Sequence, residues 1–121
     1  NAGHQPPILF FKEAREDRPS EMELRTGGTV IGPLPEAHFR RGFAKVHPGE
    51  VLLMLTDGII ERRDKAGEFF GIDRVREIVR ELQERPAQAI LDRLFETALA
   101  WGEGRPWEDD ATIVVVKRVE A

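Results

Sequence analysis

The sequence contains no cysteine and no long apolar run. The lack of cysteine excludes disulfides, thiolate nucleophiles and cysteine-ligated zinc. The longest apolar runs, residues 51–55 and 113–116, are strand-sized. They fall far below the roughly 18 residues that a membrane-spanning helix needs. These absences are compatible with a cytoplasmic protein, and that is the location we expect.

Positive charge is also in short supply, since 18 Lys and Arg face 22 Asp and Glu for a net charge of −4. Nucleic acid is therefore a poor main partner, because phosphate backbones are bound by clustered basic residues. The pairs Arg40–Arg41 and Arg62–Arg63 are too short to form such a patch. What is present is ordinary for a globular chain of 121 residues: 40% hydrophobic and 33% charged residues. This suits one domain or a large part of one.

Hydrophobic periodicity predicts several strands, then two helices, then a last strand. The strands are expected at residues 8–11, 21–25, 39–46, 51–55 and 111–119, with Gly42 interrupting the third. The helices are expected at residues 73–85, with Asp73 as N-cap, and at 87–101 after Pro86. The uninterrupted apolar run 51–55 is typical of a strand buried on both faces. This order predicts an α+β fold in which antiparallel β-sheets pack with two helices.

The strand at 51–55 leads directly into Thr56, Asp57 and Gly58. A glycine at this point lets the backbone turn sharply and leaves space beside the carboxylate. A carboxylate delivered by a buried strand needs a cation or strong hydrogen bonds. Taken alone, however, an Asp-Gly pair is more often a simple turn.

A second acidic pair, Asp109 and Asp110, stands immediately before the last predicted strand. Adjacent acids repel each other, so either a nearby cation or a solvated turn explains the pair. Mg²⁺ and Mn²⁺ prefer oxygen ligands, often single carboxylates from separate loops. The two acidic loops together predict a metal site with Asp57 and Asp109 as ligands.

Four motifs occur in order: Asn-Ala-Gly-His at 1–4, Thr-Asp-Gly at 56–58, Phe-Gly at 70–71 and Asp-Asp-Ala-Thr at 109–112. In this order and spacing the sequence resembles the metal-dependent (PPM-type, or type 2C-like) serine/threonine phosphatases. The similarity is greatest to the bacterial branch of sporulation stage II protein E and the sigma-factor regulatory phosphatases. It extends from residue 1 to about residue 117.

This resemblance implies that residues 1–121 are the C-terminal part of a single phosphatase domain, an αββα sandwich. It implies a centre of two Mn²⁺ or Mg²⁺ ions whose bridging water attacks the phosphoryl group directly. Asp57 and Asp109 match the family's metal ligands. Asp110, Gly58, His4 and Glu61 are candidates for supporting those ligands or touching the substrate, although a hairpin-turn role is equally open for His4.

The sequence departs from the family pattern in one respect. The Gly-Asp and Asp-x-x-Gly-His-Gly segments, which supply the family's other metal-site carboxylates, do not occur. We therefore expect at most half a metal site and little or no activity from this chain alone. The missing N-terminal half of the domain is the first partner we expect.

The leading hypothesis is part of a protein phosphatase that acts on a phosphorylated regulatory protein such as an anti-sigma-factor antagonist. The alternative is a non-catalytic binding module or half-domain that self-associates through exposed strand edges. Of the remaining residues, His38 and His47 are expected on the surface. We expect the arginine pair at 62–63 in a solvated loop, with attraction of a phosphoprotein as the alternative. The tryptophans at 101 and 107 are expected to pack against helices or core.

Overall fold

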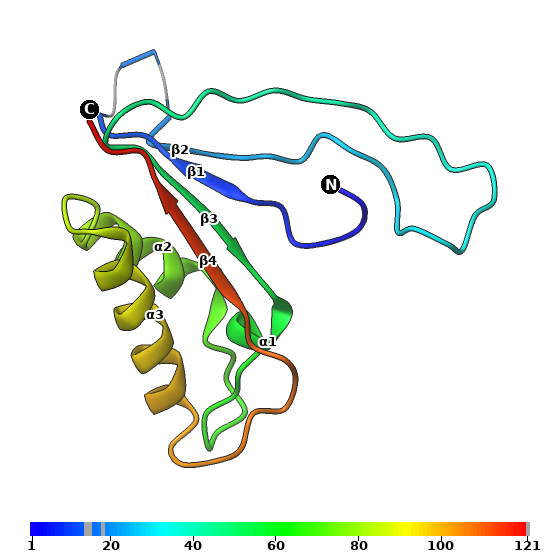
Figure 1. Ribbon diagram of the computed structural model, residues 1–121. Coiled ribbons are helices and arrows are strands. Elements are labelled where there is room, and N and C mark those ends of the chain that lie inside the picture. Colours follow the sequence, from blue (N-terminus) through cyan, green and yellow to red (C-terminus); the bar gives the residue numbers. More distant parts are fainter. Residues whose placement is uncertain (14–15, 18, 121) are drawn as a thin grey trace.

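The computed structural model describes residues 1–13, 16–17 and 19–120. In this part of the chain a four-stranded antiparallel sheet has the order β2-β1-β3-β4. Helices α2 and α3 lie against one face of that sheet (Figure 1). The elements are β1 (Ile8–Phe10), β2 (Glu21–Glu23), β3 (Val51–Leu55), α1 (Asp57–Ile60), α2 (Gly71–Glu81), α3 (Ala87–Trp101) and β4 (Ile113–Lys117). The predicted α+β class is confirmed.

The core lies between the sheet and the two longer helices. Alternate residues of β3 face the helices and are buried, while Leu52 and Met54 on the opposite face are only half-buried. The prediction that this strand is buried on both faces is therefore wrong, because α2 and α3 cover one face only. The central core residues of β3, α2 and α3 are Val51, Leu53, Leu55, Val75, Val79, Ile90 and Leu94. Full burial of such side chains stabilises the fold by roughly 1.5–3 kcal/mol each.

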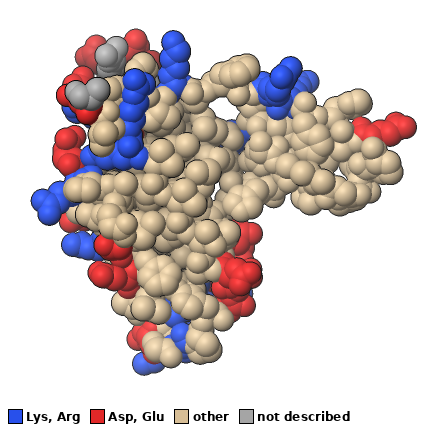
Figure 2. Space-filling model, in the orientation of Figure 1, with Lys and Arg blue, Asp and Glu red and all other residues tan. Residues whose placement is uncertain are grey.

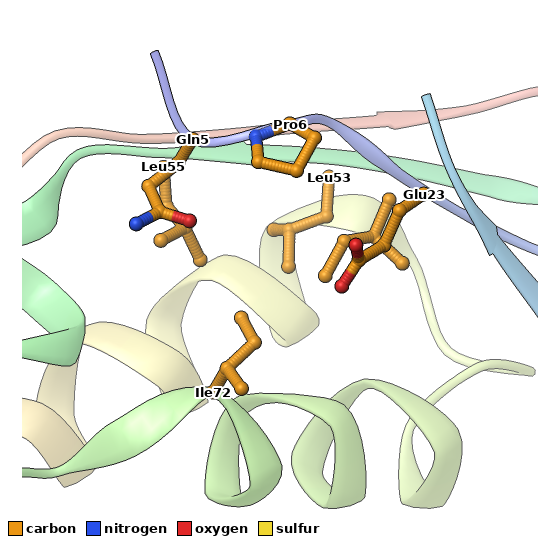
Figure 3. A pocket seen from close by; sticks show the side chains of 7 residues that line it. Gln5, Pro6, Glu23, Leu53, Leu55 and Ile72 are labelled. Atoms are coloured by element: carbon orange, nitrogen blue, oxygen red, sulfur yellow. The ribbon is translucent and has the colours of Figure 1, made fainter. Parts of the chain in front are cut away.

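A small cavity remains between the sheet and the start of α2 (Figure 3). Ile72 of α2 points from below toward Leu53 and Leu55 of β3 (Figure 3). The cavity volume is about 20 Å³, which is room for about one water molecule. It is therefore a packing gap and has no room for a substrate.

The helix ends differ slightly from the prediction. Helix α2 begins at Gly71, so Asp73 lies inside its first turn and is not the N-cap. An acidic side chain is favourable there, because it faces the positive end of the helix dipole. Helix α3 follows Pro86 as predicted and ends before Gly102. Among the described helices, none has the length and apolar character to span a membrane.

A long connection between β2 and β3 extends away from the sheet and helices (Figure 1). We call residues 27–46 the arm. Its base is joined to the start of the chain by a hydrogen bond from Gly28 N to Asn1 O of 2.9 Å. Its two limbs meet where Arg40 N donates to Gly27 O over 3.1 Å.

The strand predicted at 39–46 is wrong, because the structure has neither strand nor helix at these residues. A strand needs a neighbour that accepts its backbone hydrogen bonds, and the arm projects beyond the edge of the sheet. The large apolar side chains of the arm are instead exposed: Val30, Ile31, Leu34, Phe39 and Phe43.

Candidate metal centre

The two acidic loops meet at one end of the sheet. Strands β3 and β4 run antiparallel, with Leu55 opposite Ile113. The loop that follows β3 therefore lies beside the loop that precedes β4 (Figure 1). Residues more than fifty positions apart in the sequence thus come together by strand pairing alone.

Thr56 fastens the two loops to each other. Its backbone N donates to Thr112 O over 3.0 Å. Its hydroxyl donates to Asp110 O over 2.9 Å and accepts from Thr112 N, also over 2.9 Å. A single hydroxyl uses both its donor and an acceptor position here, so the register between the loops is fixed.

Gly58 allows the closest approach of the two loops. A Cβ atom at this position would overlap the carbonyl oxygen of Asp110 and lie 3.1 Å from that of Asp109. The partners are backbone atoms, which have little freedom to move aside. A residue without a side chain is therefore required beside the second acidic loop.

Asp57 opens the single-turn helix α1, where the sequence had indicated only a turn. The turn is closed by a hydrogen bond from Glu61 N to Asp57 O of 2.8 Å. The Asp57 side chain is exposed, because α1 leads the chain out of the sheet. The inference of a buried carboxylate at this position is therefore wrong.

Asp109 is exposed as well, and its Oδ1 accepts a hydrogen bond from Asp110 N over 2.7 Å. Acidic side chains gather at this end of the molecule beneath the arm (Figure 2). A surface opening of about 250 Å³ adjoins the two loops. Its lining residues are Gly58, Glu61, Arg62, Arg63, Phe69, Glu108 and Asp109.

The chemistry of these groups fits a hard divalent cation. Asp57 and Asp109 present exposed carboxylate oxygens from separate loops, as Mg²⁺ and Mn²⁺ sites commonly do. Across residues 1–13, 16–17 and 19–120, however, no cluster of three or more Asp, Glu, His or Cys side chains has a metal-binding arrangement. The described residues thus offer part of a ligand set. The assignment of Asp57 and Asp109 as ligands stays a prediction.

The other predicted site residues fall into two groups. Glu61 and Gly58 line the opening, and Asp110 contributes its carbonyl to the Thr56 contact. His4 is exposed, its Nδ1 lies 3.0 Å from Gln5 O, and it does not line this opening. The remaining histidines, at 38 and 47, are on the surface, as predicted.

Arg62 is the residue that the sequence did not reveal. It is 2% exposed, so the expectation that the arginine pair at 62–63 lies in a solvated loop is wrong for its first member. Arg63 does remain exposed. The local sequence gives no signal for this burial, because Arg62 lies beyond the end of α1 and its hydrogen-bond partners are 36 to 44 positions away. Trp101 and Trp107 are half-buried and pack against the core, as expected.

The fold matches those of solved phosphatase domains. It superposes on the SiaA-PP2C domain of Pseudomonas aeruginosa with a TM-score of 0.73 at 19% identity, covering 96% of this chain and 44% of that one. The phosphatase domain of the cell fate determinant SpoIIE from Bacillus subtilis, presoaked with Mn, gives a TM-score of 0.55 at 23% identity. Here 99% of this chain and 49% of the other are covered. The fold class is therefore that of the PP2C phosphatase domains.

The sequence then identifies the family. The family model for stage II sporulation protein E (SpoIIE) matches residues 1–119, so the chain belongs to the SpoIIE family. It is also 30% identical over 118 residues to protein IcfG of Synechocystis sp.. That alignment covers 98% of this chain and 18% of IcfG. The chain spans less than half of both solved phosphatase chains described above. The resemblance inferred from the four motifs is confirmed.

Proposed function

We propose that the chain is the C-terminal half of a metal-dependent protein serine/threonine phosphatase domain. One observation carries the proposal: in a SpoIIE-family fold, Thr56 and Gly58 hold the Asp57 and Asp109 loops in direct contact. Either acidic loop alone is compatible with an ordinary turn. Two such loops fixed side by side are the arrangement that a shared cation requires.

In this proposal Asp57 and Asp109 hold Mn²⁺ or Mg²⁺. The bound ions supply a water of lowered pKa and neutralise phosphoryl charge. The chain's own residues fix the geometry: Thr56 sets the register of the loops, and Gly58 sets their separation. Arg63 adds positive charge at the same opening, where its guanidinium lies 4.9 Å from the Phe69 ring centroid and 3.7 Å from the Glu108 carboxylate. An arginine at this position suits attraction of a phosphorylated side chain.

The proposed substrate is a phosphorylated regulatory protein of the anti-sigma-factor antagonist type. Support comes from the motif resemblance to the sigma-factor regulatory phosphatases and from membership of the SpoIIE family. The net charge of −4 also favours a protein partner over nucleic acid. A cytoplasmic location follows from that substrate class and is part of the same proposal.

The proposed partner of this chain is the N-terminal half of the same domain. The sheet face opposite the helices is apolar and incompletely covered, with Leu52 and Met54 half-buried and Val114 and Val116 exposed. The solved phosphatase chains are about twice as long as the part that this chain matches. A second layer on this face would bury the exposed apolar side chains, as two-layer packing requires.

The test is to join this chain to an N-terminal half from a SpoIIE-family phosphatase domain and to measure phosphate release from a phosphoserine protein. We expect Mn²⁺-dependent turnover from the joined protein, none after Asp57→Asn, and little from the chain alone. The Asp92→Asn variant is the matched control, because Asp92 is an exposed acid on α3, away from both acidic loops. Turnover that survives both metal removal and Asp57→Asn would overturn the proposal.

A non-catalytic, self-associating half-domain is the second candidate. The exposed apolar side chains of the arm favour it, because exposed apolar patches commonly mark association surfaces. Size-exclusion chromatography with light scattering tests it. A concentration-dependent dimer supports this candidate, and a monomer at all concentrations removes it.

A further inference from the structure

Arg62 is buried, and among the described residues no carboxylate forms a salt bridge with it. It is 2% exposed, and its hydrogen-bond partners within the described part of the chain are all backbone carbonyls. A guanidinium is always charged, and burying it is costly unless its donors are satisfied. Four backbone carbonyl groups therefore satisfy the donors of this one side chain and hold it in place.

Those carbonyls belong to two different segments. Nε donates to Ala98 O over 2.8 Å, and one terminal nitrogen reaches Leu99 O over 3.4 Å, both in the last turn of α3. The terminal nitrogens also donate to Arg105 O over 2.9 Å and to Pro106 O over 3.2 Å. The last carbonyls of a helix carry partial negative charge, which favours a cation at this point. Arg62 thus joins the end of α3 to the loop that leads to Asp109.

Two neighbours shape this pocket around the guanidinium. The ring of Trp107 lies 4.1 Å from the guanidinium carbon, within the range of a cation–π interaction. Gly102 leaves the space on another side, because a Cβ there would overlap the guanidinium. The side chain is therefore held by planar contacts and by directed hydrogen bonds, which lysine has no means to reproduce.

Arg62 and its hydrogen-bond partners lie close in sequence to the two predicted metal ligands. Arg62 follows Asp57 by five residues, and its partners at 105–107 precede Asp109 by two to four. Thr56 makes the corresponding contacts on the other side, at Asp110 and Thr112. The segment 56–62 therefore forms hydrogen bonds to the second acidic loop both before and after Asp109.

We propose that Arg62 is a positioning residue for the metal site: it fixes Asp109 relative to Asp57 by tying residues 105–107 to the segment that follows Asp57. This inference rests on the proposed function, since it assumes that both carboxylates bind the same metal centre. It assigns no contact between Arg62 and metal or substrate. Its effect passes through the backbone of the loop.

The experiment is calorimetric titration of Mn²⁺ into the full chain and its variants. Arg62→Lys keeps the charge but loses the fork of donors and the stacking plane. We expect it to weaken Mn²⁺ affinity about tenfold, the lower end of the range for residues that orient metal ligands. Arg93→Lys is the matched control and should bind Mn²⁺ as the wild type does, because Arg93 is an exposed arginine on α3 that faces Glu81 over 4.0 Å.

A double variant separates positioning from general stability. If Arg62 acts through Asp109, then Arg62→Lys causes no further loss of Mn²⁺ affinity in an Asp109→Asn background. Thermal unfolding without metal is recorded in parallel for each variant. Should Arg62→Lys fail to fold, Trp107→Leu removes the ring beneath the guanidinium and leaves the four carbonyls, and we expect a weaker loss in the same direction.

The outcomes are distinct. A folded Arg62→Lys variant that binds Mn²⁺ as tightly as the wild type overturns the role of Arg62, even if its melting temperature falls. If Asp57→Asn and Asp109→Asn also bind like the wild type, the metal site itself fails and the proposed function fails with it. Loss of affinity in Arg62→Lys, with Arg93→Lys unchanged and no additivity with Asp109→Asn, is the result that we expect.

Discussion

Apolar side chains are buried in the body of the protein but exposed in the arm at residues 27–46. The body consists of the sheet and its helices. Phe10 in β1 is 0% exposed, whereas Phe43 in the arm is 96% exposed. The body has two layers whose apolar faces meet each other. The arm extends from the sheet and has no layer to pack against (Figure 1).

This difference shows that the body buries its apolar side chains in its own core, whereas the apolar side chains of the arm remain exposed and available to a partner. The candidate metal centre follows the same division. The body fixes the loops of Asp57 and Asp109 by internal contacts, while the further ligands that a two-metal centre needs are not among the described residues. The arm and the candidate site thus support, from unrelated observations, the proposal that an N-terminal half of the domain packs against this chain.

The largest expected effect comes from removing a core ring. Phe70→Ala empties a fully buried position immediately before α2, where the ring packs edge-on against Trp101 of α3. We expect a loss of about 3–5 kcal/mol in the free energy of unfolding, measured by urea titration. Phe43→Ala, the matched change in the arm, should alter it by less than about 0.5 kcal/mol. Equal losses would erase the distinction between body and arm.

A smaller effect is expected from adding one methyl group at Gly58. The new Cβ would press on backbone atoms of the second acidic loop. We expect Gly58→Ala to destabilise the chain by about 1–3 kcal/mol, again measured in urea. Ala44→Val in the arm is the control, because it enlarges an exposed side chain that lies outside any helix or strand. A Gly58→Ala variant as stable as the control would show that the loops are not in close contact.

The third effect concerns the hydroxyl of Thr56. Thr56→Val keeps the shape but removes the group that bridges Asp110 O and Thr112 N. Two lost hydrogen bonds correspond to a destabilisation of about 1–3 kcal/mol. Thr29→Val, at an exposed position in the arm, should be neutral by the same urea measurement. Faster amide hydrogen exchange at Thr112 in Thr56→Val alone would locate the loss at this contact.

The last prediction involves no change in stability. It concerns which peptide bonds are accessible to trypsin in a limited digestion. Cleavage should begin in the arm at Arg40 and Arg41, which are exposed and lie outside any helix or strand, and should spare the bond after the buried Arg62. An added N-terminal half of a SpoIIE-family domain should slow the arm cleavage. First cleavage after Arg62 would contradict the packing of the body.

Sequence alone predicted the parts of the fold that depend on local pattern. The uninterrupted apolar run at 51–55, the apolar stripe of 87–101 and the Asp-Gly and Asp-Asp motifs placed β3, α3 and the two acidic loops correctly. Because β3 and β4 are paired through their whole lengths, the motifs at their ends had to meet.

The errors arose where structure depends on distant contacts. Residues 39–46 have strand-like composition but no paired neighbour to complete a ladder. Arg62 has the composition of a surface residue, yet its burial is set by carbonyls 36 to 44 positions further along the chain. The exposure of Asp57 depends on the single helical turn of α1, which four residues are too few to signal.

The central claim is that Asp57 and Asp109 form one metal site, and Mn²⁺ titration of the ¹⁵N-labelled chain followed by NMR tests it most directly. Paramagnetic Mn²⁺ broadens the signals of nearby amides. We expect the amides of Gly58 and Asp110 to broaden together at the same Mn²⁺ concentration, and both to stay sharp in Asp57→Asn. Broadening of one loop without the other, or broadening that persists in Asp57→Asn, would contradict it.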